Sequence, residues 1–153
     1  MVIREATFAD EAELLPMMRK LAEQEPGSIK FDELAARTAF RKFSSLPAFG
    51  RVWLLCEANK PVGYIVLTLG FSFEFHGQDA FIDELYVDAA YRRRGIGRQA
   101  MQFAEGKARE MRVNALHLEV DDGNDPALEL YLRTGFEDHE RFLMTKWLNR
   151  EDH

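Results

Sequence analysis

The sequence predicts a mixed α/β (α+β) fold: a central, mostly antiparallel sheet with one parallel crossover and helices on both faces. The spacing of apolar residues changes from helical to strand-like and back along the chain, and the later part has a strand, helix, strand order. The length of 153 residues suits one domain, and the 46% of residues that are hydrophobic can fill its core. No linker, repeat or low-complexity tract interrupts the chain, so we expect one domain over residues 1–153.

The first third of the chain predicts a strand and two helices. Val2–Ala6 has the composition of a short strand. Asp10 and Asp32 each precede a segment with apolar residues at helical spacing, and aspartate is a favoured N-cap. We expect the first helix to end at Pro26-Gly27 and the second near Ser44.

The remaining elements follow from strand composition, helical periodicity and turn residues. In chain order we expect strands Arg51–Ala58, Val62–Phe73 and Ala80–Asp88, a helix Gly95–Met111, a strand Ala115–Asp121, a helix from Asp125 to Gly135, and closing strands at Phe136 and Phe142–Leu148.

Charge and composition exclude several classes of partner. The chain has 20 basic and 26 acidic residues and a net charge of -6, which disfavours binding to nucleic acid. Its apolar runs are too short for a membrane span, and its N-terminus lacks signal-peptide features. The single Cys56 fits a reducing compartment, so we expect a cytoplasmic protein. The histidines lack metal-ligand spacing, so we expect no metal.

A glycine turn between a predicted strand and a predicted helix carries the first candidate site. In Arg92–Gly97 the glycines allow close approach of a ligand, and the backbone N–H groups at the helix start attract anions. The neighbouring arginines add charge-assisted hydrogen bonds. We therefore interpret the segment as a phosphate site; the plainer interpretation is a solvated basic helix start.

A dinucleotide site is the sharper alternative for this turn. Gly95, Gly97 and Ala100 match the G-x-G-x-x-A pattern, and Glu119 lies on the next predicted strand. Two features count against it: Asp88–Arg94 separate the strand from the first glycine, and the antiparallel first half offers no succession of β-α-β units. The P-loop pattern is missing from the sequence.

A second cluster starts the last predicted helix. Ala127 and Tyr131 are one helical turn apart, so a ligand can lie against the small residue with a phenol beside it. Asn124 precedes them. Taken alone, such a tyrosine is usually a packing residue and such an asparagine a cap.

Together these motifs resemble those of the GNAT superfamily of acyl-CoA-dependent N-acetyltransferases. The matching segments, which span about a third of the chain in the family's order, are Leu85-Tyr86-Val87, Arg92-x-x-Gly95-x-Gly97 and Asn124-x-x-Ala127-x-x-x-Tyr131-x-x-x-Gly135-Phe136. The resemblance implies the GNAT fold and a set of residues that bind acetyl-CoA. These residues are Leu85, Tyr86, Val87, Arg92, Arg93, Arg94, Gly95, Ile96, Gly97, Arg98, Asn124, Ala127 and Tyr131.

The resemblance also implies roles in catalysis. Backbone groups of Leu85 and Val87 would pair with the pantetheine arm, and the Leu85 amide would polarise the thioester carbonyl. Tyr131 would protonate the departing thiolate. An ammonium acceptor must lose a proton, and Asp83 is the expected base, with Glu84 and Glu119 in reserve. Strand alternation would send Asp83 and Glu84 to opposite faces.

We therefore expect an enzyme that moves acetyl from acetyl-CoA directly to an amine in a ternary complex. The acidic composition and the neighbouring carboxylates Asp83 and Glu84 favour a small cationic amine such as a polyamine. A protein N-terminus or lysine is the alternative acceptor, and a CoA-binding sensor without chemistry is the alternative function. The resemblance leaves a homodimer open.

Overall fold

The computed structural model describes residues 1–25 and 30–149. They form two compact units, Met1–Leu118 and a second unit from Glu119 onward, which are described one at a time. The predicted helix end at Pro26-Gly27 lies outside the described residues.

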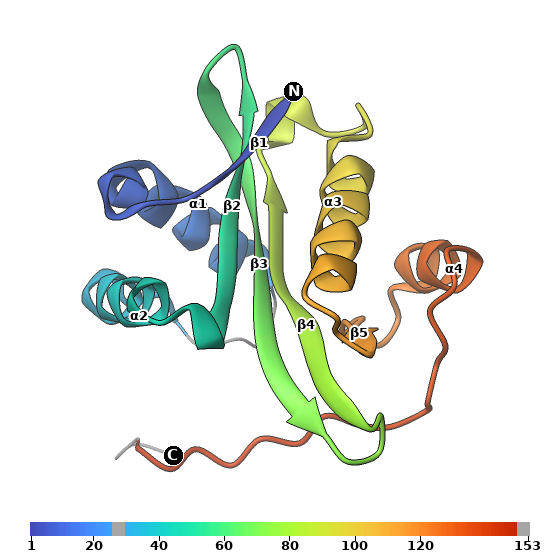
Figure 1. Cartoon of the computed structure of the whole chain (residues 1–153). Coiled ribbons are helices and arrows are strands. Elements are labelled where there is room, and N and C mark those ends of the chain that lie inside the picture. The colour runs from blue at the N-terminus through green and yellow to red at the C-terminus, as the bar shows by residue number, and fades with distance from the viewer. Residues whose placement is uncertain (26–29, 150–153) are drawn as a thin grey trace. The chain divides into compact units, whose positions relative to one another are not determined.

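The first unit is built on a five-stranded sheet in the order β1-β2-β3-β4-β5 (Figure 1). Neighbouring strands are antiparallel except β4 and β5, which are parallel, so the predicted mixed sheet with one parallel crossover is confirmed. The strands are β1 (Val2–Glu5), β2 (Gly50–Glu57), β3 (Lys60–Ser72), β4 (Gly77–Val87) and β5 (Ala115–His117).

Three helices of this unit agree closely with the predicted ones: α1 (Glu11–Gln24), α2 (Glu33–Ser45) and α3 (Ile96–Glu110). Asp32 caps α2 as predicted, since its carboxylate accepts hydrogen bonds from the backbone N–H groups of Leu34 and Ala35. Asp10 does not cap α1 with its side chain. Its carboxylate instead accepts hydrogen bonds from both terminal nitrogens of the Arg4 guanidinium at 2.9 Å.

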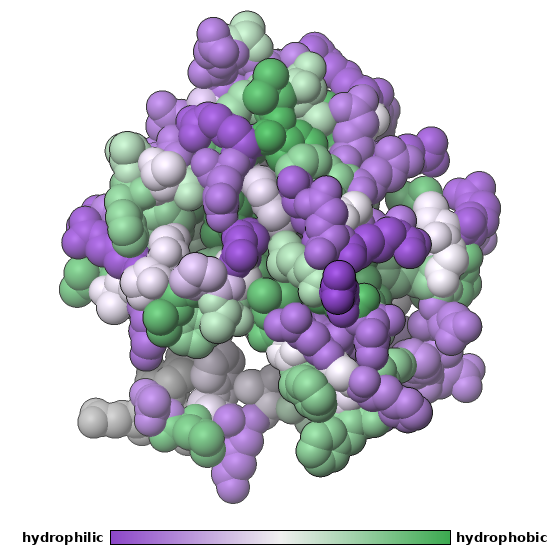
Figure 2. Space-filling view, viewed as in Figure 1, coloured by the Kyte–Doolittle hydropathy of each residue, from purple (hydrophilic) through white to green (hydrophobic). Residues whose placement is uncertain are grey.

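The helices cover both faces of the sheet, as predicted (Figure 1). On one face, called the α1/α2 face, residues of α1 and α2 pack against alternate strand residues such as Leu54 and Tyr64. On the other, the α3 face, Ala100 and Ala104 of α3 pack against Leu55 of β2 and its neighbours. Hydrophilic side chains predominate on the surface of the molecule shown in Figure 2.

Two predicted strand regions differ from the structure. β5 ends at His117 rather than near Asp121, because its ladder with β4 ends at the pair Phe81 and His117. The closing strands are wrong for residues 136–149, where the structure has no strand and Phe142 is 92% exposed. Alternating apolar residues give a segment the propensity to form a strand, but they do not provide a neighbouring strand. A strand forms only when a neighbour hydrogen-bonds to its backbone N–H and C=O groups.

The described part of the second unit contains one helix, α4 (Asp125–Arg133), which begins at the predicted residue and ends two residues before the predicted Gly135. In the part of the chain that the structure describes, no helix combines the length and the apolar character needed to cross a membrane.

Candidate active site

The glycine turn forms a concave array of backbone N–H groups. Arg93 and Gly95 have left-handed backbone conformations, with φ of 65° and 78°, and such residues between right-handed ones turn successive N–H groups toward one side. Gln99 donates the first α-helical hydrogen bond of α3, to the carbonyl of Gly95. The amides of Ile96, Gly97 and Arg98 therefore precede the intrahelical ladder and point out of the helix start.

A hollow of about 280 Å³ lies over this array. Its lining residues are Val87, Tyr91, Arg92, Arg93, Gly95, Ile96 and Gly97. Free amides, a helix dipole and arginines converge on one small volume, which suits the two phosphates of a pyrophosphate.

Arg92 also has a structural role that the sequence did not reveal. Its Nε donates a hydrogen bond to the carbonyl oxygen of Val87 at 2.9 Å, which ties the turn back to the end of β4. The guanidinium of Arg94 lies 5.1 Å from the centre of the Tyr91 ring, a cation–π contact. Two of the three arginines are thus held in place before any ligand arrives.

The outer edge of β4 is open next to this turn. Asp88 donates its backbone N–H to the carbonyl of Val62 on β3, and hydrogen-bonded pairs alternate with non-hydrogen-bonded ones along an antiparallel ladder. Leu85 and Val87 are therefore in the alternate register, with their N–H and C=O groups directed away from β3. Because β5 pairs with β4 only as far as Phe81, that edge can accept an added strand-like ligand.

Tyr86 lies between these two residues and has a different environment. Its side chain is 3% exposed in the α1/α2 core, its hydroxyl donates to Asp88 at 2.8 Å, and its backbone is in register with Tyr64 of β3. Burial is the main cause that raises the pKa of Tyr86 to about 12. Tyr86 thus supports the strand by packing, and the polar groups on the open edge belong to Leu85 and Val87.

Asp83 is the extra residue of a β-bulge. Val66 of β3 pairs with Glu84, while the next residue, Leu67, pairs with Ile82. The prediction that Asp83 and Glu84 face opposite sides assumed regular alternation, which a bulge interrupts. Burial raises the pKa of the Asp83 carboxyl above its usual range.

Glu84 is a partly buried carboxyl with a specific partner. The hydroxyl of Tyr64, a fully buried side chain of β3, donates a hydrogen bond to Glu84 Oε1 at 2.9 Å. Burial, with smaller contributions from the charges of Asp83 and Glu25, raises the pKa of Glu84 to about 7, although the Tyr64 hydrogen bond acts in the opposite direction. Glu84 therefore changes its protonation near neutral pH.

This pKa makes stability depend on pH. Between pH 4.5, the ordinary value for glutamate, and about 7, the unfolded chain has lost the Glu84 proton while the folded chain keeps it, so stability falls as pH rises. Glu84→Gln removes this penalty and keeps an acceptor for Tyr64. We expect it to raise the free energy of unfolding at pH 8 by roughly 1–3 kcal/mol and to have no effect near pH 4.

Urea unfolding of the variant and the wild type at both pH values measures this effect. Glu110→Gln, at an exposed position near the end of α3, is the matched control and should change stability little at either pH. Equal stability of the Glu84 variant and the wild type at pH 8 would contradict the raised pKa.

The second unit holds the other predicted residues. The side chain of Asn124 caps α4 by accepting a hydrogen bond from the Ala127 backbone N–H at 3.4 Å. The Tyr131 ring meets Phe136 edge to face, with centroids 5.7 Å apart. Burial raises the pKa of Tyr131, which therefore remains protonated at neutral pH. The reserve base Glu119 is exposed at the start of this unit.

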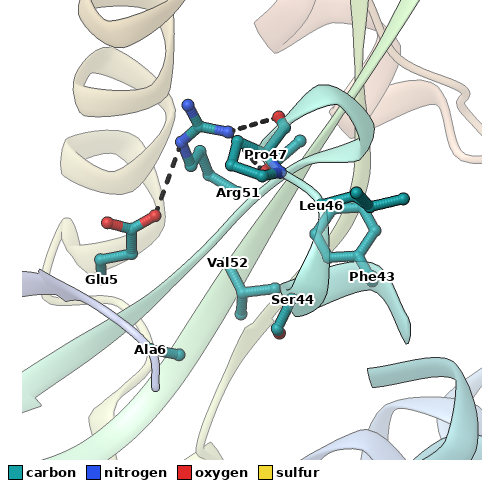
Figure 3. Close-up of a pocket in the computed structure, with 9 residues that line it drawn as sticks. Glu5, Ala6, Phe43, Ser44, Leu46, Pro47, Arg51 and Val52 are labelled. Carbon is teal, nitrogen blue, oxygen red and sulfur yellow. Dashed lines mark hydrogen bonds and ion pairs between the residues drawn. The ribbon is translucent and has the colours of Figure 1, made fainter. Parts of the chain in front are cut away.

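A second hollow, of about 270 Å³, carries none of the predicted site residues (Figure 3). It lies between Ala6, the end of α2 and the start of β2. Its one guanidinium, Arg51, donates to the carbonyl of Pro47 at 2.6 Å and forms an ion pair with Glu5 at 3.5 Å. This charge is already balanced within the protein. No group of metal-binding side chains occurs at either hollow or elsewhere in residues 1–25 and 30–149.

The model of the acetyltransferase (GNAT) family matches residues 15–136. The chain belongs to the GNAT family. The predicted family is thus confirmed. Together with the N-acetyltransferases among the relatives of the chain, it shows that the protein is an acetyl-CoA-dependent N-acetyltransferase.

Relatives agree with this assignment. A thialysine N-epsilon-acetyltransferase from Bos taurus is 30% identical over 145 residues, covering 90% of this chain and 84% of the relative. An integron cassette protein from the mobile metagenome of Cole Harbour Salt Marsh has a TM-score of 0.82 and 32% identity, covering 97% of this chain and 91% of its own.

An aminoglycoside 6'-N-acetyltransferase from Acinetobacter haemolyticus has a TM-score of 0.77 over 97% of this chain and 100% of its own. At 16% identity it supports the GNAT fold alone. The predicted fold class is thus confirmed by both the sheet topology and the solved structures of this shape.

Proposed function

We propose that this GNAT enzyme transfers acetyl from acetyl-CoA to the primary amine of a small cationic acceptor, by direct attack in a ternary complex. The observation that carries the proposal is the placement of two carboxyls, Asp83 and Glu84, at a bulge beside the open edge of β4. A cationic amine is attracted to that pair, and the acyl donor has a backbone edge beside it. The similarity to a thialysine N-epsilon-acetyltransferase supports a small amine as acceptor.

In this proposal the residues of the first unit bind the donor and activate the acceptor. The amides of Ile96, Gly97 and Arg98 and the nearby arginines hold the pyrophosphate, and the Val87 backbone, whose carbonyl also accepts from Arg92, pairs with the pantetheine arm. The Leu85 amide donates to the thioester carbonyl oxygen, where negative charge develops. Asp83 accepts a proton from the acceptor ammonium, since its raised pKa makes it a better base than an ordinary aspartate.

The last steps of the proposed reaction involve Tyr131, Asn124 and Ala127. The neutral amine nitrogen attacks the carbonyl carbon, the tetrahedral intermediate collapses, and the carbon–sulfur bond breaks. Tyr131 gives its proton to the departing thiolate. Asn124 contributes its amide nitrogen to the pantetheine chain, and Ala127 leaves room for it. We propose that residues 1–153 act as one catalytic domain in the cytoplasm, with a homodimer left open.

Release of free CoA thiol from acetyl-CoA tests the function across a panel of thialysine, L-lysine, spermidine, an aminoglycoside and a lysine-containing peptide. Amine-dependent release with a small cation supports the proposal. Release with the peptide alone would identify a protein-directed acetyltransferase, and tight acetyl-CoA binding without release on any amine would favour a sensor.

Asp83→Asn is expected to lower kcat by about 100-fold or more and to remove the acidic limb of the pH profile of kcat. The reason is that the amide cannot accept a proton from the ammonium. Steady-state rates from pH 5 to 9 measure both effects. Persistence of the acidic limb in the variant would assign the base to Glu84 or to water.

A further inference from the structure

A histidine and an aspartate form a partly buried pair across the β4–β5 ladder, apart from the residues of the proposed catalytic site. His117 Nε2 lies 3.1 Å from Asp79 Oδ2, and the two side chains are 16% and 14% exposed. The Phe75 and Phe81 rings contact the imidazole, with centroid distances of 4.7 and 4.9 Å. The imidazole is therefore held in position by one hydrogen bond and two aromatic rings.

The pair determines which imidazole nitrogen carries a proton. A carboxylate without a proton can only accept hydrogen bonds, so in the tautomer that donates to Asp79 the hydrogen is on Nε2 of His117. Its other nitrogen, Nδ1, then keeps a lone pair in a fixed direction. A group of this kind is suited to accept a hydrogen bond from a donor such as an ammonium.

The pair lies on the same face of the sheet as Glu84. Ala80 and Leu116 belong to the α3 face, so their strand neighbours Asp79, Phe81 and His117 face the opposite side. That side is the α1/α2 face, where Tyr64 bonds Glu84.

The pair is also close to the proposed base along the strands. Phe81 and His117 are the last pair of the parallel ladder, and Asp83 comes two residues after Phe81. With a strand spacing of about 4.8 Å and a rise of about 3.3 Å per residue, the Cα atoms of His117 and Asp83 are about 8 Å apart. At this separation one ammonium can contact both residues when the bulge turns the Asp83 side chain to the face of His117.

We propose that His117 binds the acceptor amine and that Asp79 is a positioning residue acting through it. Nδ1 of His117 accepts one N–H of the ammonium while Asp83 takes the proton that must leave. His117 exchanges no proton in this step; it orients the nitrogen toward the thioester carbonyl. The inference rests on the proposed function, because it supplies a second contact to the same acceptor.

His117→Gln is the decisive variant. Its amide can reach Asp79 from the position of Nε2 but has no acceptor at the position of Nδ1. We expect KM for the acceptor to rise about 10-fold or more, with unchanged KM for acetyl-CoA and an unchanged thermal midpoint. His117→Asn places its amide near the Nδ1 position, so it should restore part of the acceptor affinity.

Asp79→Asn provides the test of the positioning role. An asparagine can donate to Nε2 and so shift the imidazole hydrogen to Nδ1, which then cannot accept. The single variant Asp79→Asn should therefore raise the acceptor KM. In the double variant, Asp79→Asn should raise it little beyond the value of His117→Gln. A purely structural pair would instead lower the thermal midpoint and change KM for both substrates.

The experiment uses the full chain with thialysine, L-lysine and spermidine as probe amines, and His76→Asn as control. His76 is an exposed histidine of the β3–β4 hairpin with a left-handed φ of 65°, which asparagine tolerates, so its replacement should leave both KM values unchanged. Wild-type turnover with an unchanged acceptor KM in His117→Gln would overturn this inference and leave the function intact. No turnover of any probe by the wild type would overturn both.

Discussion

Gly97→Glu is expected to reduce acetyl-CoA affinity by at least about 100-fold while leaving the protein folded. Gly97 is the second residue of α3, and its amide faces the hollow over the glycine turn. A Cβ built there meets only the Leu85 Cδ2 atom, at 4.0 Å, so the backbone need not move. The new carboxylate would occupy the anion site and repel the pyrophosphate, and a negative charge in the first turn of a helix favours folding. Calorimetry with acetyl-CoA measures the loss.

Two further glycine variants separate charge from size and position. Gly97→Ala adds only a methyl group in ordinary contact and should bind acetyl-CoA nearly as well as the wild type. Gly106→Glu puts the same charge on the exposed middle of α3, where a Cβ meets nothing within 4 Å, and should leave binding unchanged. Retained affinity in Gly97→Glu would place the phosphates elsewhere on the protein.

The sequence predicted those parts of the fold that short-range patterns determine. The three helices of the first unit and its first four strands lie within a few residues of their expected bounds, because periodicity and turn residues act locally. The Asp32 cap is likewise encoded within four residues. The prediction of a strand at residues 142–148 was wrong because a strand needs a neighbouring strand, which no local pattern specifies.

The sequence likewise predicted the contiguous parts of the candidate site and missed the contacts between distant residues. The glycine turn and the α4 motif are contiguous segments, so their residues were predicted by number. The bulge at Asp83, the Tyr64 hydrogen bond to Glu84 and the pair of Asp79 with His117 depend on strand register, which brings together residues far apart in sequence. The short-range patterns of the sequence indicated none of these contacts.

Tyr131→Phe is expected to lower kcat by about 100-fold or more with little change in acetyl-CoA affinity. In the proposed mechanism the tyrosine protonates the departing thiolate, and proton transfer by a positioned acid contributes about 100-fold to 10,000-fold. Burial raises the pKa of Tyr131, so the acid form is present throughout the neutral range and any basic limb of kcat should lie above pH 10. The phenyl ring keeps the edge-to-face contact with Phe136.

The size of the kcat effect must be separated from damage to α4. Thr134→Ala also removes a hydroxyl from the end of this helix, one that donates to the Tyr131 carbonyl at 2.9 Å, and should leave kcat nearly unchanged. Rates with saturating acetyl-CoA and calorimetric binding for both variants make the comparison. A normal kcat in Tyr131→Phe would mean that water protonates the thiolate. Equal losses in the two variants would show that the integrity of α4, and not the phenol, limits the rate.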